Sequence, residues 1–266
     1  MTEARAYAGY VFDLDGTVYL DDELLPGAGT TIQTLRERGA AVVFATNKPL
    51  ETADQYAAKL SGLGIPTTPD QIITAVDSVV RYLRAEHDGA RLLTIAEDVV
   101  DRRLRREGFE ITADPAATDV VVVSFDRTFD YAKLNAAYRA VRHNGAAIVA
   151  TNPDPYCPTA DGGLPDCAAM LAALEACTGR RAKAVLGKPS RWMAETCLHR
   201  LGVAASEAAV VGDRILTDVA MGKQLGAAGI LVLSGATRAA DVVGSGVVPD
   251  LVLDGIAGLL AGDDDR

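Results

Sequence analysis

The sequence has few cysteines, few histidines and no long apolar segment. Its four cysteines form no C-x-x-C pair and show no spacing typical of a zinc site or of a small disulfide-bonded domain. Its three histidines have no partner at the spacing of metal ligands. No stretch approaches the roughly 18 consecutive apolar residues of a membrane span. We therefore expect a cytoplasmic protein with reduced thiols and without a membrane partner.

Positive charge is also scarce. Lysine and arginine number 26 against 36 aspartates and glutamates, so the formal net charge is −10. This charge repels a nucleic-acid backbone and an anionic membrane, and neither is expected as a partner. The sequence also lacks a Walker-type phosphate loop and a Gly-x-Gly-x-x-Gly between a strand and a helix, so nucleotide-driven and dinucleotide chemistry lack support.

Strand-like runs rich in valine, isoleucine and alanine alternate with longer helical patterns from end to end. This alternation is typical of crossover units and a mostly parallel sheet, and it predicts a doubly wound α/β fold. Strands are expected at residues 10–12, 41–45, 92–95, 120–123, 147–150, 184–186, 208–211, 230–233 and 251–253. Helices are expected near residues 27–38, 51–63, 75–86, 98–106, 131–143 and 215–225.

The pattern of the first part returns after residue 184, whereas the middle of the chain has enough strands for a layer of its own. The length of 266 residues allows one large domain or two smaller ones. We therefore predict a core formed by residues 1–74 and 181–266, and an insertion formed by residues 75–180.

Four polar segments follow four of the expected strands. In an open parallel sheet, ligands bind just beyond the carboxyl ends of the strands. The candidate residues, in chain order, are Asp13 and Asp15, Thr46 and Asn47, Lys188, then Asp213 and Asp218. Singly, each has an ordinary interpretation as a turn, a helix cap or a solvated charge. Together, they supply the carboxylates, hydroxyl, amide and cation that phosphoryl transfer requires.

The first pair suggests the chemistry. Asp13 can attack phosphorus, because a carboxylate is already ionised at neutral pH and needs no activating base. Asp15 is two residues further on and is expected on the same side of the strand end, where it can act as the acid and base. Two such carboxylates repel each other unless a cation or a proton lies between them. We therefore expect a Mg²⁺ site here.

The other segments fit the remaining tasks. Thr46 can hold the phosphoryl oxygens through its hydroxyl and backbone N–H, and Lys188 can hold them as a compact charge. Asn47 is a candidate beside them. Asp213 would complete the Mg²⁺ shell, in which several waters remain. Asp218 would either bind the ion directly or orient that shell.

These motifs resemble those of the haloacid-dehalogenase-like hydrolase superfamily over nearly the whole chain. The segments are Asp-Leu-Asp-Gly-Thr-Val-Tyr at 13–19, Thr-Asn at 46–47, Ala-Thr-Asn-Pro-Asp at 150–154, Gly-Lys-Pro-Ser at 187–190 and Gly-Asp-Arg-Ile-Leu-Thr-Asp at 212–218. They are most similar to the class IIA, nitrophenylphosphatase type, a branch that includes glycerol-phosphate phosphatases and the arabinose-operon sugar phosphatase.

The resemblance implies a Mg²⁺-dependent phosphatase with a Rossmann-like core and an inserted α/β cap. It implies that Asp13 is the nucleophile, that Asp15 is the acid and base, and that Thr46 and Lys188 bind phosphate. It also implies that Asp213 holds the metal together with the Asp13 carboxylate and the Asp15 carbonyl. Members of the family commonly form dimers through the cap, so a homodimer is possible.

The segment that ends at Asp154 repeats the pattern around Thr46. We hypothesise that Asn152, Asp154 and residues 163–167 help to select the leaving group of a small phosphorylated metabolite. A turn rich in proline and aspartate explains the same residues equally well.

The leading hypothesis for function is hydrolysis of a small phosphomonoester, such as a sugar phosphate or glycerol phosphate, through an aspartyl-phosphate. A phosphomutase would use the same intermediate. A protein that binds a phosphometabolite without turning it over is a third alternative.

Overall fold

The computed structural model describes residues 6–157 and 163–260, which form two compact units. The first unit comprises residues 1–46, 53–73 and 194–266, and the second comprises residues 47–52 and 74–193. The outer ends of the predicted core, and residues 158–162 of the predicted insertion, lie outside the described residues. The predicted bounds of core and insertion, 1–74 with 181–266 and 75–180, stay a prediction.

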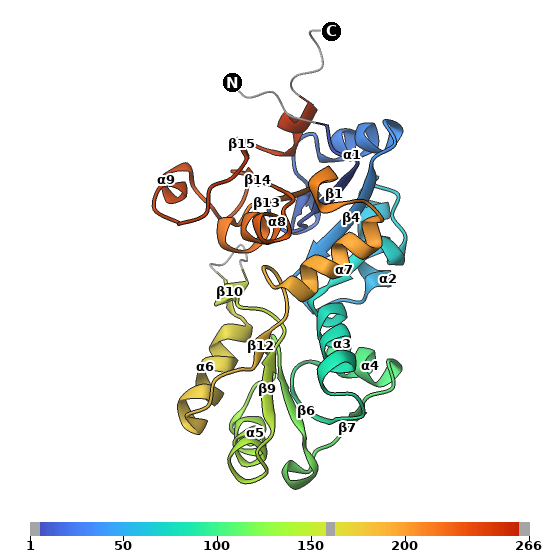
Figure 1. Ribbon diagram of the computed structural model, residues 1–266. Helices are drawn as coiled ribbons and strands as arrows, with labels where there is room; N and C mark the ends of the chain where they lie inside the picture. The colour runs from blue at the N-terminus through green and yellow to red at the C-terminus, as the bar shows by residue number, and fades with distance from the viewer. Residues whose placement is uncertain (1–5, 158–162, 261–266) are drawn as a thin grey trace. The chain divides into compact units, whose positions relative to one another are not determined.

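The first unit is built on a six-stranded sheet in the order β15-β14-β13-β1-β4-β5 (Figure 1). The strands pair in parallel in β1–β13, β1–β4, β13–β14 and β14–β15. The strands are β1 (Gly9–Phe12), β4 (Ala41–Thr46), β5 (Ile72–Thr74), β13 (Ala208–Gly212), β14 (Ala228–Val232) and β15 (Leu251–Leu253). A short hairpin, β2 (Tyr19–Leu20) and β3 (Glu23–Leu24), follows β1. The central position of β1 places the residues that follow it in the middle of the sheet's carboxyl edge.

Helices pack on this sheet through alternate strand residues. Phe12 of β1 and Val232 of β14 belong to a core that also contains Ile32 of α1 (Ala28–Glu37) and Leu60 of α2 (Ala53–Gly62). Leu231, one residue along β14, instead belongs to a smaller core. The other helices with residues in this unit are α7 (Arg191–Leu201), α8 (Ala220–Leu225) and α9 (Ala239–Val242). Both faces of the sheet are therefore covered, as expected for a parallel sheet.

The second unit has its own parallel sheet in the order β12-β9-β8-β6-β7 (Figure 1). Its strands are β6 (Arg91–Ile95), β7 (Glu110–Ile111), β8 (Val120–Val123), β9 (Ala147–Ala150) and β12 (Ala184–Val185). The helices are α3 (Ala75–Glu86), α4 (Asp98–Arg106), α5 (Tyr131–His143) and α6 (Cys167–Thr178). A second hairpin joins β10 (Tyr156–Cys157) to β11 (Leu164–Pro165).

The four consecutive valines of β8 show how this sheet packs between two layers of helices. Val120 and Val122 pack with α3 and α4 on one face, while Val121 and Val123 pack with α5 and α6 on the other. All four side chains are fully buried. A strand covered on both faces has no polar alternation, which is why the sequence here is continuously apolar.

The parallel sheets and their helices confirm the predicted α/β class. The expected helix over residues 215–225 is corrected in detail: a π-helical turn, Ile215–Val219, precedes α8. There the Asp218 carboxylate accepts a hydrogen bond from the backbone N–H of Arg214 at 3.0 Å. Such π turns are frequent at functional sites. No helix in the described ranges is both long and apolar enough to cross a membrane.

Candidate active site

Three carboxylates converge at the carboxyl edge of the first sheet. Asp13 follows β1, Asp213 follows β13, and Asp218 lies in the π turn. One oxygen from each lies within 4.8 Å of the others. The register explains the first two, because β1 and β13 pair in parallel with Phe12 opposite Val211, and the N–H of Asp13 donates to the Val211 carbonyl at 2.9 Å. Sequence positions about 200 apart thus end at one point.

The cluster has little access to water. Asp13 is 9 % exposed, Asp213 3 % and Asp218 0 %. Burial first, and then the charges of Asp13 and Asp218, raise the pKa of Asp213 to about 7, against the lowering effect of the Ala236 N–H. The Asp213 Oδ1 atom has no hydrogen-bond partner among the described residues. Buried carboxylate oxygens that repel one another fit a hard divalent cation such as Mg²⁺.

Glycines surround these carboxylates closely. Gly16 has a φ of 84°, and a Cβ there would lie 2.7 Å from Asp213 Oδ2. A Cβ on Gly235 would clash with the same carboxylate, and one on Gly212 would clash with that of Asp218. The backbone N–H of Ala236 donates to Asp213 Oδ2 at 2.5 Å. The space around the cluster therefore admits backbone but no side chain.

Asp15 lies beyond the end of strand β1, where it forms an isolated β-bridge with Tyr19. Strand β1 ends at Phe12, and the Leu14 carbonyl accepts hydrogen bonds from the N–H groups of residues 17–19. Both Asp13 and Asp15 follow the strand, so their placement on one side stays a prediction. The Asp15 carboxylate is partly exposed and is not one of the three clustered groups. Thr17 Oγ1 donates to Asp13 Oδ2 at 3.3 Å.

The remaining predicted residues divide between the units. Thr46 ends β4 in the first unit and is 3 % exposed. Asn47, Asn152, Asp154 and Lys188 belong to the second unit, where all four are buried.

The Asn47 side chain forms hydrogen bonds with both the backbone N–H and the backbone carbonyl of Lys188. The N–H of Lys188 donates to Asn47 Oδ1 at 2.7 Å, and Asn47 Nδ2 donates to the Lys188 carbonyl at 3.2 Å. Asn47 Nδ2 also donates to Asp154 Oδ2 at 2.8 Å. A Cβ on Gly187 would clash with Asn47 Oδ1 and the Thr151 carbonyl, so glycine is required where these segments meet.

The network continues into the predicted leaving-group segment. Asn152 Nδ2 donates to Asp154 Oδ2 at 3.0 Å and to Asp166 Oδ1 at 3.2 Å. Asp166 caps α6, since its Oδ1 accepts from the N–H of Cys167 at 2.5 Å. The structure thus joins Asn152, Asp154 and part of residues 163–167 through hydrogen bonds within one unit.

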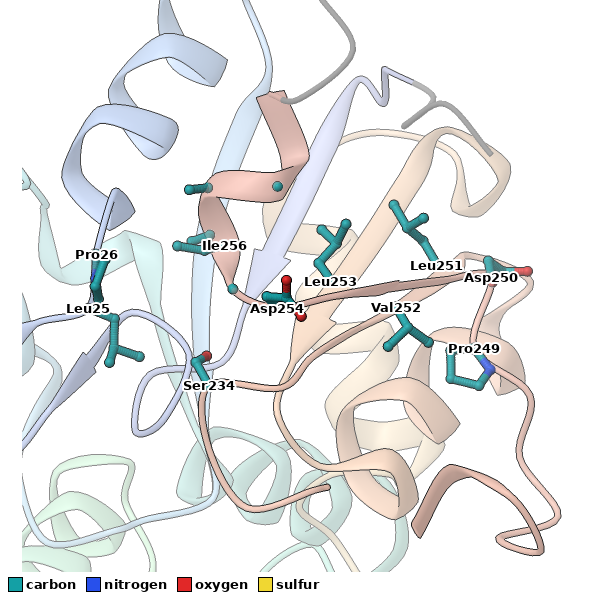
Figure 2. Close-up of a pocket in the computed structure, with 13 residues that line it drawn as sticks. Leu25, Pro26, Ser234, Pro249, Asp250, Leu251, Val252, Leu253, Asp254 and Ile256 are labelled. Atoms are coloured by element: carbon teal, nitrogen blue, oxygen red, sulfur yellow. The ribbon is translucent and has the colours of Figure 1, made fainter. Parts of the chain in front are cut away.

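A separate cavity of about 880 Å³ lies along β15 in the first unit (Figure 2). Its lining includes Leu25, Val252 and Ile256, together with the carboxylates of Asp250 and Asp254. No lysine or arginine lines it among the described residues, so it does not suit a phosphate.

Comparison with known proteins identifies the family. A family model described as haloacid dehalogenase-like hydrolase matches residues 10–110, and a model of HAD-like hydrolases matches residues 185–259. Sugar-phosphatase AraL of Bacillus subtilis (strain 168) is 35 % identical over 94 % of this chain and 90 % of its own. The chain belongs to the haloacid dehalogenase-like hydrolases.

Further relatives of this hydrolase include solved structures. The 5'-nucleotidase YutF of Bacillus subtilis (strain 168) is 32 % identical over 88 % of this chain and 90 % of its own. The p-nitrophenyl phosphatase from Archaeoglobus fulgidus has a TM-score of 0.90 and 30 % identity, covering 97 % of this chain and 99 % of its own. NagD from E. coli K-12 has a TM-score of 0.85 and 28 % identity, covering 95 % and 98 %. These matches confirm the predicted family and its Rossmann-like fold, and the relatives' phosphatase names agree with the predicted enzyme class.

Some residues at this hydrolase's candidate site had no signal in the sequence. Gly235 and Ala236 follow β14 in a segment, residues 233–237, without a charged residue, so nothing pointed to their contact with Asp213. Asp166 lies within the predicted segment 163–167, and its role as a helix cap also had a signal, because an aspartate directly before the apolar run of α6 is a helix-capping pattern.

Proposed function

We propose that this hydrolase cleaves small phosphomonoesters, with sugar phosphates and glycerol phosphate as the first candidates, with Mg²⁺ and through an aspartyl-phosphate. The observation that carries the proposal is the buried cluster of Asp13, Asp213 and Asp218 at the carboxyl edge of the sheet. The names of the relatives support the substrate class, since AraL and a Staphylococcus aureus relative are sugar phosphatases by name.

In the first step, the Asp13 carboxylate attacks phosphorus and the bond to the ester oxygen breaks. Asp15 donates its proton to the departing alkoxide, which leaves as an alcohol. In the second step, Asp15 takes a proton from water, and the resulting hydroxide attacks the phosphorus of the aspartyl-phosphate. Inorganic phosphate leaves and the Asp13 carboxylate is restored. The Thr17 hydroxyl, which donates to Asp13 Oδ2, would hold the nucleophile in one orientation.

The residues fit a Mg²⁺ ion, because they supply only oxygen ligands and carry negative charge out of contact with bulk water. Asp13 and Asp213 would hold it through their carboxylates, Asp15 through its carbonyl, and Asp218 either directly or by orienting the others. When bound, the ion neutralises the phosphoryl oxygens and reduces the repulsion between the two anions that react.

Thr46 and Lys188 are proposed to bind the phosphoryl oxygens, the first by hydrogen bonds and the second by charge. The second unit is proposed to act as the cap that selects the leaving group, and a homodimer through it stays a prediction.

The test is release of inorganic phosphate from a panel of sugar phosphates, glycerol phosphate and p-nitrophenyl phosphate, with Mg²⁺ or with EDTA. Wild-type protein should release phosphate only with Mg²⁺, and Asp13→Asn should release none. The control is Asp22→Asn, since that carboxylate is 93 % exposed and pairs only with Lys59 among the described residues. Mg²⁺-dependent release by Asp13→Asn would refute the nucleophile, and conversion to an isomeric phosphate would indicate a mutase.

A further inference from the structure

The side chain of Asn47 has no N–H left for a substrate. Its two N–H groups donate to the Asp154 carboxylate and the Lys188 carbonyl, and its oxygen accepts from the Lys188 N–H. The partners fix the orientation of the Asn47 amide. The Lys188 N–H must face its oxygen, and the Lys188 carbonyl and the Asp154 carboxylate must face its nitrogen. Asn47 therefore holds the peptide groups on both sides of the Lys188 Cα atom.

Asp154 holds Asn47 in turn. Its Oδ2 atom accepts from Asn47 Nδ2 at 2.8 Å and from Asn152 Nδ2 at 3.0 Å. Asp154 is 7 % exposed and Asn152 is fully buried, so these hydrogen bonds are shielded from water. Losing one partner of a buried hydrogen bond to a charged group is costly, which makes the arrangement well defined.

We infer that Asn47 and Asp154 are positioning residues that fix the backbone of Lys188 and so aim its ammonium group, and that neither selects the leaving group. The inference rests on the proposed function, in which Lys188 binds the phosphoryl group. The conformation of the lysine stem starts from its Cα atom, so freedom at that atom would spread the ammonium group over many positions. A site for a planar or tetrahedral anion requires the charge in one place.

The substitutions Asn47→Ala and Asp154→Ala test this inference. Both should weaken the binding of inorganic phosphate, measured by calorimetry with Mg²⁺, by roughly 10- to 100-fold. They should lower kcat/KM by the same factor for every ester in the panel, since inorganic phosphate and all esters share the phosphoryl group. A residue that contacts the leaving group would instead change kcat/KM for some esters and leave phosphate binding unchanged.

A double-mutant cycle with Lys188→Met separates positioning from direct contact. If Asn47 acts only through Lys188, adding Asn47→Ala to Lys188→Met should not weaken phosphate binding further. If Asn47 touched phosphate itself, the two losses would add. The conservative Asp154→Asn retains an oxygen acceptor, so it should restore phosphate binding to within a few-fold of wild type. It also keeps the test open if the alanine variant does not fold.

The control for loss of a buried carboxylate is Asp126→Asn in the same unit. Asp126 is fully buried and pairs with Lys133 at 2.6 Å, with no hydrogen bond to this network among the described residues. It should lower the melting temperature and leave phosphate binding as in wild type. Additive losses, or losses confined to particular esters, would overturn the inference. If Lys188→Met alone left binding and turnover unchanged, the proposed role of Lys188 in the function would fall instead.

Discussion

Replacing Asp213 with asparagine tests whether the three clustered carboxylates bind a cation. Burial first, and then the charges of Asp13 and Asp218, raise the pKa of Asp213 from 3.8 to about 7. A rise of about three pKa units corresponds to about 4 kcal/mol between the protonated and ionised forms. Because the pKa is higher in the folded state, this contribution to stability is complete below pH 3.8 and is lost as the pH rises through about 7.

The variant Asp213→Asn removes the charge and keeps an oxygen for the Ala236 N–H. Without metal at pH 8, its free energy of unfolding should exceed that of wild type by up to about 4 kcal/mol, and the difference should disappear towards pH 4. Mg²⁺ should narrow this difference. At 100 times its dissociation constant it would stabilise wild type by about 2.7 kcal/mol, and it should not stabilise the variant.

Urea unfolding followed by far-ultraviolet circular dichroism, at pH 4, 6 and 8 with EDTA or Mg²⁺, measures both effects. Comparing the variant with wild type at each pH cancels the titration of all other groups. The exposed Asp22→Asn should follow wild type throughout. A metal-free variant less stable than wild type at pH 8, or equal stabilisation of both proteins by Mg²⁺, would refute the reasoning.

Three further predictions follow from single residues. Gly235→Ala should abolish stabilisation by Mg²⁺ and most activity, because its methyl group would clash with the Asp213 carboxylate, which is proposed to bind the ion. Gly255→Ala has open space and should behave as wild type in both assays. Asp15→Asn should slow turnover by roughly 10²- to 10⁴-fold, as measured by phosphate release, and an unchanged rate would exclude its role as acid and base. Burial raises the pKa of Cys167 to about 11, so at pH 8 iodoacetamide should label the exposed Cys177 and spare Cys167 until the protein unfolds. Mass spectrometry locates the label, and rapid labelling of native Cys167 would contradict the described packing.

Much of the architecture follows from local patterns in the sequence. The helices at Ala75–Glu86 and Tyr131–His143 begin and end at the predicted residues, because each has a polar residue that caps its start and a regular apolar face. The convergence of Asp13 and Asp213 could also be predicted from the sequence, because parallel strands bring their carboxyl ends to one edge of the sheet. Periodicity and topology are sufficient for both.

Features that depend on three-dimensional contacts could not be predicted from the sequence. β1 ends at Phe12 as predicted, but the β-bridge of Asp15 with Tyr19 and the hydrogen bonds of residues 17–19 to the Leu14 carbonyl do not follow from hydrophobic periodicity. The contact of Asn47 with Asp154 joins residues 107 positions apart. Sequence alone suggested for each of them a direct contact with substrate, whereas their hydrogen bonds connect them to each other.

The valine run of β8 has a consequence for handling the protein. Four consecutive valines without charge or proline have high β-propensity, and in a chain that has not yet folded they offer a site for intermolecular strand pairing. Asp119 stands directly before them and pairs with Arg91 in the native state, so it is placed as a gatekeeper against aggregation. Soluble yield during expression should therefore depend on this carboxylate far more than its exposed position in the finished fold suggests.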